Sequence, residues 1–178
     1  MQSSQGGTDA YLLDTNITSA IWDRGHPYHD TTAARVKSEL GQADRLVISV
    51  ISLGETENGM ALARFDSRRE AQIRAAARSH RVILPVTHHI AETYGKIRAA
   101  VFERYASGKK QRKGRPESLP DLVPSQQLGV QENDLWLYST AVTHNLIFVT
   151  ADAKIARITD VTPASLNYSF RPLIWPWS

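Results

Sequence analysis

Short apolar runs alternate along the chain with longer stretches whose apolar residues recur at helical spacing. The run LVISVI at residues 46–51 is almost wholly apolar, which is typical of a strand covered on both faces. Strands are predicted at residues 11–13, 46–51, 81–85 and 146–149, and near 166–168. Helices are expected between them, at residues 15–22, 29–40, 52–65, 67–80, 89–105, 131–144 and 152–158.

This alternation predicts an α/β fold, a three-layer α/β/α sandwich around a central, mainly parallel sheet. Residues 1–9 are polar and predict a flexible tail, and residues 10–178 are expected to form a single domain. Within that domain, residues 108–128 hold three prolines and five basic residues. We therefore expect an inserted loop there.

The composition narrows the class of protein. The chain has no cysteine, which excludes disulfides, thiolate metal sites and a cysteine nucleophile. No apolar run approaches the roughly 18 residues that a membrane-spanning helix needs. Residues 1–9 lack the apolar core of a secretory signal. We expect a cytoplasmic protein with no membrane partner.

The net charge of +3 conceals two opposed parts. Residues 64–115 carry fourteen basic and four acidic side chains, a net charge of +10, and the rest of the chain carries −7. A basic segment favours a polyanionic partner. Solvated helix faces would explain the same charges.

Four carboxylates lie where strands meet helices. Functional residues of parallel sheets gather beyond the carboxyl ends of the strands. The four are Asp14 directly after the first strand, Glu55 after the second, Asp134 in the helix before the fourth strand, and Asp152 shortly after that strand.

Each acid alone has a structural explanation, because an acid in the first turn of a helix caps free N–H groups. Ser52 and Glu55, for example, fit a capping box. Four carboxylates at one edge would repel one another unless a cation lay between them. Mg²⁺ or Mn²⁺ suits such oxygen ligands, and metal–carboxylate clusters hydrolyse phosphodiesters.

The segments around these acids resemble the PIN-domain family, and within it the VapC-type toxins of bacterial toxin–antitoxin pairs. The matching segments are LLDTN at 12–16, SLGE at 52–55, NDLWL at 133–137 and VTAD at 149–152. Their order and spacing make the resemblance specific, and it runs from about Ala10 to the C-terminus. Gly54 stands where the family more often has Ala, and the insertion at 108–128 is longer than the usual connection.

The resemblance implies a PIN-like fold and an endoribonuclease that uses Mg²⁺ or Mn²⁺ to activate water. It also implies RNA as substrate, a cognate antitoxin protein as partner, and a homodimer. By position, the matching residues are the catalytic acids Asp14, Glu55, Asp134 and Asp152, with Asp14, Asp134 and Asp152 as metal ligands, and the supporting residues Asn16 and Thr150.

The basic insertion holds the best RNA-contact candidates outside the acids, because such side chains neutralise phosphates. These are Lys109, Lys110, Arg112, Lys113 and Arg115.

Other functions stay open at this point. They are an RNA-processing nuclease without an antitoxin, an inactive RNA-binding PIN module, and a receiver-like signalling domain. A receiver would need a lysine directly after a later strand, and Lys154, within a predicted helix, is the nearest.

Overall fold

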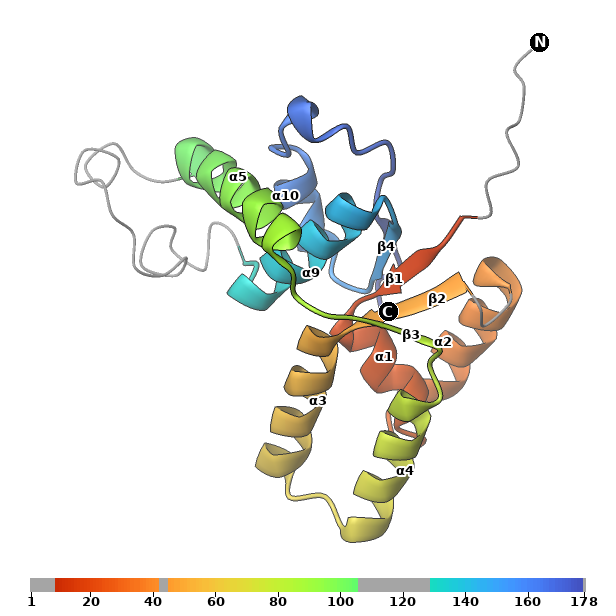
Figure 1. Cartoon of the computed structure of the whole chain (residues 1–178). Coiled ribbons are helices and arrows are strands. Elements are labelled where there is room, and N and C mark those ends of the chain that lie inside the picture. The colour runs from red at the N-terminus through yellow and green to blue at the C-terminus, as the bar shows by residue number, and fades with distance from the viewer. Residues whose placement is uncertain (1–8, 42–44, 106–128, 178) are drawn as a thin grey trace.

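The computed structural model describes residues 9–41, 45–105 and 129–177 (Figure 1). The predicted tail and the 108–128 insertion therefore lie almost wholly outside the described residues. Within these residues, five parallel strands form one sheet in the order β3-β2-β1-β4-β5. The strands are β1 (Tyr11–Leu13), β2 (Leu46–Ser49), β3 (Val82–Leu84), β4 (Ile147–Thr150) and β5 (Leu173–Ile174).

Helices cover both faces of the sheet, as the α/β/α prediction requires (Figure 1). One face carries α1 (Thr15–Trp22), α2 (His29–Arg35), the π-helical turn η1 (Val36–Leu40) and α4 (Ser67–Arg78). The other face carries α5 (His88–Tyr105), α9 (Glu132–His144), the 3₁₀ turn η3 (Ala153–Ile155) and α10 (Ala156–Thr159).

The side chains of β1 point alternately to the two faces of the sheet and so enter two separate hydrophobic cores. Leu12 and Leu13 are both fully buried, but successive side chains of a strand point to opposite faces. Leu12 accordingly packs in the cluster with α5 and α9, and Leu13 packs in the cluster with α1 and α4. The central strand is thereby fixed in register by apolar burial on both sides.

Helix α3 (Val50–Ala63) begins earlier than predicted, and the proposed capping box is wrong. The hydroxyl of Ser49 accepts a hydrogen bond from the Ile51 amide at 3.2 Å, so the N-cap is Ser49 and not Ser52. The strand LVISVI is therefore shortened by its last two residues. Glu55 lies in the second turn of α3, where it is not needed as a cap.

The last strand also differs from the prediction. Residues 166–168 do not form a strand: Ala164–Leu166 is a 3₁₀ turn, η4, and Asn167 has a left-handed backbone with φ of 52°. Pairing to β4 begins only at Leu173, opposite Val149. Helix α9 ends at Asn145, whose backbone is also left-handed, with φ of 51°.

The strand order determines where a site can form. The chain leaves β1 toward β2 on one side and β4 lies on the other, so β1 and β4 form a topological switch point, where ligands bind at the carboxyl ends of the strands. Receiver domains have the order 2-1-3-4-5, so the receiver hypothesis is wrong. Among the described residues, no helix combines the length and apolar character needed to cross a membrane.

Candidate active site

Asp14 lies at the switch point, between the ends of β1 and β4. It is only 4% exposed, and its backbone N–H donates to the Val149 carbonyl at 2.9 Å. Its carboxylate accepts hydrogen bonds from the Thr15 amide at 2.7 Å, from Asn16 Nδ2 at 2.7 Å and from the Thr150 hydroxyl at 2.5 Å. A buried carboxylate with three donors has its orientation fixed.

Asn16 and Thr150, predicted as supporting residues, complete this network. The side-chain oxygen of Asn16 accepts from the Ala151 amide at 3.0 Å, while its Nδ2 also lies 3.1 Å from Thr150 Oγ1. The Thr150 hydroxyl oxygen accepts from the Asp152 amide at 3.0 Å. The first and the last predicted acids are thus joined through two neutral side chains.

Glu55 reaches the same place from α3. Its carboxylate accepts from the hydroxyl of Thr15 and from Asn133 Nδ2, the latter at 2.9 Å. The two donors directly adjoin Asp14 and Asp134, so one glutamate connects α1, α3 and α9. We did not predict a role for Thr15 or Asn133. Their positions directly beside Asp14 and Asp134, within LLDTN and NDLWL, could have indicated such a role.

Asp134 and Asp152 also serve as helix caps. Asp134 accepts from the Gln131 amide at 2.7 Å at the start of α9, and Asp152 accepts from the Lys154 amide at 2.9 Å at the start of η3. The structural explanation weighed for these acids is therefore correct. It does not exclude a second role, because a carboxylate has about four acceptor positions.

Burial raises the pKa of Asp14 to about 7, against an ordinary value near 3.8. The hydrogen bonds from Thr150 and Thr15 oppose this shift, and the negative charges of Asp134 and Glu55 increase it. Asp14 thus lies within electrostatic reach of two other predicted acids.

Burial likewise raises the pKa of Asp134 to about 6. The charges of Glu55 and Asp152 raise it further, while the Gln131 amide and the Lys154 ammonium oppose the shift. The four acids predicted from sequence therefore influence one another in the folded chain. Like charges so placed are expected to be relieved by a cation or a proton.

The donor chemistry fits a hard divalent cation, since every candidate ligand is a carboxylate oxygen. The raised pKa values of Asp14 and Asp134, caused first by burial and then by the neighbouring carboxylates, point the same way. In the described ranges, however, no three acidic or histidine side chains converge closely enough to form a ready ligand set. These carboxylates are therefore candidate ligands, of which Mg²⁺ often uses only one or two together with water.

Replacing Thr150 with Val is expected to lower the free energy of unfolding by about 1–3 kcal/mol, because the Asp14 carboxylate loses its shortest hydrogen bond while remaining buried. Thr150→Ser keeps the hydroxyl and serves as the matched control, with a smaller loss. Urea unfolding at pH 7.5 measures both variants. Equal stability of the Val variant and the wild type would show that this hydrogen bond is not needed.

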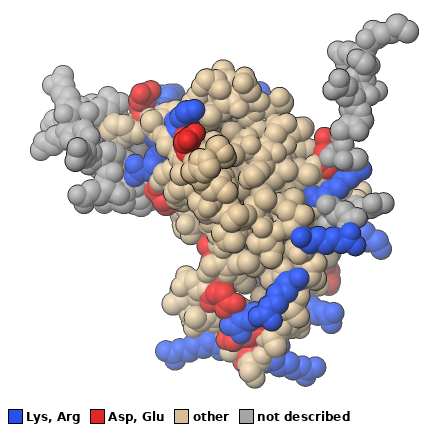
Figure 2. All heavy atoms as spheres, in the orientation of Figure 1, with Lys and Arg blue, Asp and Glu red and all other residues tan. Residues whose placement is uncertain are grey.

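The basic middle of the chain is not a uniform surface for a polyanion. Arg69 is paired with Asp23 at 2.6 Å, and Arg98 is paired with Glu132 at 3.1 Å. On the arm formed by α3 and α4, acidic and basic side chains are interspersed (Figure 2), including Arg74, which lies 2.7 Å from Glu57 and 2.8 Å from Glu70. The five predicted RNA-contact residues of the insertion lie outside the described residues.

Comparison with protein families identifies the fold and the family. The model of the PIN domain matches residues 11–161, so the chain belongs to the PIN-domain family, whose members are generally nucleases. Gly54, where the family more often has Ala, has open space where a Cβ would lie. No protein with a curated functional description matches this chain.

Solved structures show the same fold. FitAcB from Neisseria gonorrhoeae is similar with a TM-score of 0.59 and 20% identity, covering 94% of this chain and 98% of that one. VapBC-1 from nontypeable Haemophilus influenzae has a TM-score of 0.53 and 26% identity, covering 92% and 97%. VapBC-5 from Mycobacterium tuberculosis, a member of the VapBC family of toxin–antitoxin systems, has a TM-score of 0.53 and 20% identity, covering 93% and 98%.

Proposed function

We propose that this PIN-domain protein is a Mg²⁺- or Mn²⁺-dependent endoribonuclease and the toxin of a toxin–antitoxin pair. The observation that carries the proposal is the buried Asp14 at the β1–β4 switch point, within electrostatic reach of Glu55 and Asp134, the latter in turn within reach of Asp152. The similarity to VapBC and FitAcB structures supports the toxin assignment.

In this mechanism, Asp14, Asp134 and Asp152 would hold the cation. When bound, Mg²⁺ lowers the pKa of water and neutralises charge on the phosphate. Thr150 and Asn16 hold the Asp14 carboxylate in one orientation through their hydrogen bonds. Held by two donors, Glu55 completes the cluster or orients the attacking water. The expected products carry 5′-phosphate and 3′-hydroxyl ends.

A groove beside Glu55 offers a path for an antitoxin segment. A pocket of about 190 Å³ lies between α1, α3 and α4, and its lining includes Met60, Phe65 and Ile73 as well as Asp23 and Glu55. An apolar segment bound there would end beside the acids, where a basic antitoxin side chain could pair with them. We also expect the protein to form a homodimer, within a larger complex when the antitoxin is present.

Expression in cells tests the whole proposal. RNA 5′ ends are mapped after brief induction of the wild type and of Asp14→Asn, with and without co-expression of a candidate antitoxin, a small protein from a neighbouring gene. New 5′-phosphate ends and growth arrest, absent in the variant and suppressed by the neighbour, are expected. Cleavage without growth arrest would favour the RNA-processing alternative, and no new ends would contradict the nuclease.

The basic insertion is expected to contribute RNA affinity. Replacing Lys109, Lys110, Arg112, Lys113 and Arg115 with Gln should weaken binding at 50 mM salt and reduce the log–log salt slope by up to about 3.5, because each phosphate contact contributes about 0.7. Fluorescence anisotropy with a single-stranded RNA measures both quantities, in an Asp14→Asn background that prevents cleavage. An unchanged slope would show that these side chains do not contact phosphate.

A further inference from the structure

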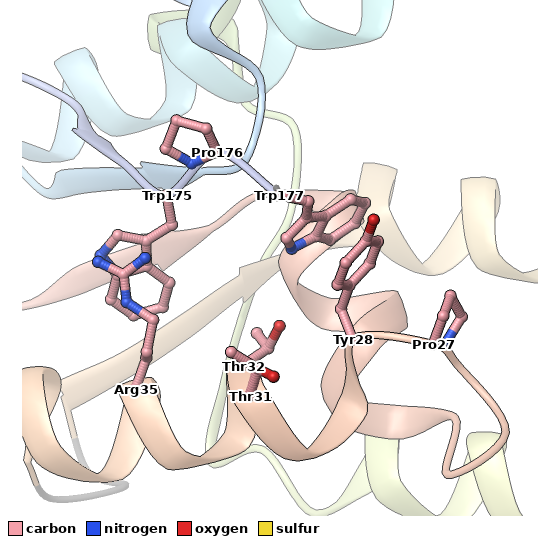
Figure 3. Close-up of a pocket in the computed structure, with 8 residues that line it drawn as sticks. All are labelled: Pro27, Tyr28, Thr31, Thr32, Arg35, Trp175, Pro176 and Trp177. Atoms are coloured by element: carbon pink, nitrogen blue, oxygen red, sulfur yellow. The ribbon is translucent and has the colours of Figure 1, made fainter.

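An aromatic pocket lies between α2 and the segment that follows β5 (Figure 3). Its volume is about 280 Å³. The lining is mostly rings, hydroxyls and one guanidinium, from Tyr28, Thr31, Thr32, Arg35, Trp175 and Trp177, together with Pro27 and Pro176.

The walls of the pocket are two stacked pairs. The Tyr28 and Trp177 rings lie 4.8 Å apart at 14°, and the guanidinium of Arg35 lies 4.6 Å above the Trp175 ring. Arg35 is held there by Glu39, at 2.8 Å. Trp175 is 2% exposed, so its ring is held in place by its neighbours, whereas Trp177 is partly exposed. The planar groups of these walls are therefore in place before any ligand arrives.

This pocket is adjacent to the acidic site. The Trp175 backbone N–H donates to the Thr150 carbonyl at 2.7 Å, and the Thr150 hydroxyl donates to Asp14. The pocket thus lies at the same carboxyl edge of the sheet, on the β5 side. His26 lines the groove that contains Glu55, and its ring lies 5.2 Å from the Trp177 ring, so the two hollows are neighbours.

We propose that this pocket binds an unpaired nucleobase of the RNA strand, a few nucleotides from the bond that is cut. The inference rests on the proposed nuclease function. Every base has a π-face that can stack on Trp, Tyr or an arginine plane, and such stacking tolerates any sequence. The hydroxyls of Thr31 and Thr32 offer hydrogen bonds to a base edge.

Charge favours RNA over an apolar peptide as the occupant. Lys and Arg side chains stand over the α2 side of the molecule (Figure 2), and the guanidinium of Arg35, which is paired with Glu39, belongs to the lining of the pocket. A single strand whose phosphates follow these cations would bring one base to the pocket while its backbone passes Asp14. The pocket would then select single-stranded over double-stranded RNA.

The experiment measures binding of a labelled single-stranded RNA of twelve nucleotides by fluorescence anisotropy, in the Asp14→Asn background with Mg²⁺. Trp177→Leu and Tyr28→Leu are expected to weaken binding by about fivefold to a hundredfold each. Trp177→Phe should restore most of the affinity, because a ring is again present. Phe170→Leu, which removes a ring before β5, is the matched control and should bind normally. Circular dichroism verifies that each variant is folded.

A second arm measures binding of the same RNA annealed to its complement. A third arm measures RNA cleavage by Trp177→Leu and Tyr28→Leu in the chain that retains Asp14. The duplex should bind equally to Trp177→Leu and to its parent. Equal single-strand affinity of all variants, or no RNA binding by the parent, would overturn the pocket proposal. If the variants lost only affinity for the antitoxin, the pocket would bind a protein instead. Ring-dependent RNA binding without any Mg²⁺-dependent cleavage by the wild type would refute the nuclease and leave the pocket standing.

Discussion

Asp14→Asn is expected to abolish Mg²⁺-dependent RNA cleavage, lowering the rate by about a thousandfold or more, while the fold survives. The carboxylate lies at the centre of the hydrogen-bond network, 2.7 Å from Asn16 Nδ2 and 2.5 Å from the Thr150 hydroxyl. Asparagine has the same shape but lacks the negative charge that a cation needs. The remaining donors keep the ends of β1 and β4 together.

The measurement is cleavage of a single-stranded RNA with Mg²⁺ and with EDTA, beside circular dichroism of each variant. Asp160→Asn removes an acid just after α10 and is the control, which should cleave like the wild type. Full activity of a folded Asp14→Asn protein would refute the nuclease assignment. Loss of activity in both variants would indicate a general charge effect instead of a role for Asp14.

The second large effect is on stability without metal. Because the pKa of Asp14 is raised from 3.8 to about 7 in the folded chain, the folded protein binds a proton over this range that the unfolded chain has already lost. Stability contributed by this group is therefore complete below about pH 4 and declines as the pH rises through 7. The loss between pH 5 and pH 8 is about 3 kcal/mol.

Urea unfolding in EDTA at pH 5 and pH 8 measures this loss. The wild type should lose more stability over the interval than Asp14→Asn, and the difference isolates the Asp14 carboxyl from other titrating groups. Added Mg²⁺ should reduce the wild-type loss, because a cation stabilises the ionised form. Parallel behaviour of the two proteins would show that Asp14 titrates normally.

The sheet and its acids could be predicted from sequence because both depend on local signals. Apolar runs mark β1, β2 and β4, and short motifs mark Asp14 directly after β1, Asp134 in the first turn of α9 and Asp152 two residues after β4. Leu173–Ile174 could not be found in the same way, because a two-residue strand has no period and is defined only by its pairing to β4.

The other features that the sequence did not predict depend on contacts between distant segments. Ser49 and Ser52 both precede the same helical run, and only the end of β2 decides which one caps α3. Glu55 is held by Thr15 and Asn133, which are 40 and 78 residues away. The stacking of Tyr28 on Trp177 likewise depends on the completed fold.

The pairing of β1 with β4 has a consequence for synthesis. Asp14 and Thr150 are separated by 136 residues, so their hydrogen bond can form only after β4 has left the ribosome. A nascent chain that ends before β4 carries Asp14 and Glu55 but lacks Thr150 and Asp152, so the proposed site cannot assemble in it. Under the proposed function, such a chain would be unable to cleave RNA while it is still being made.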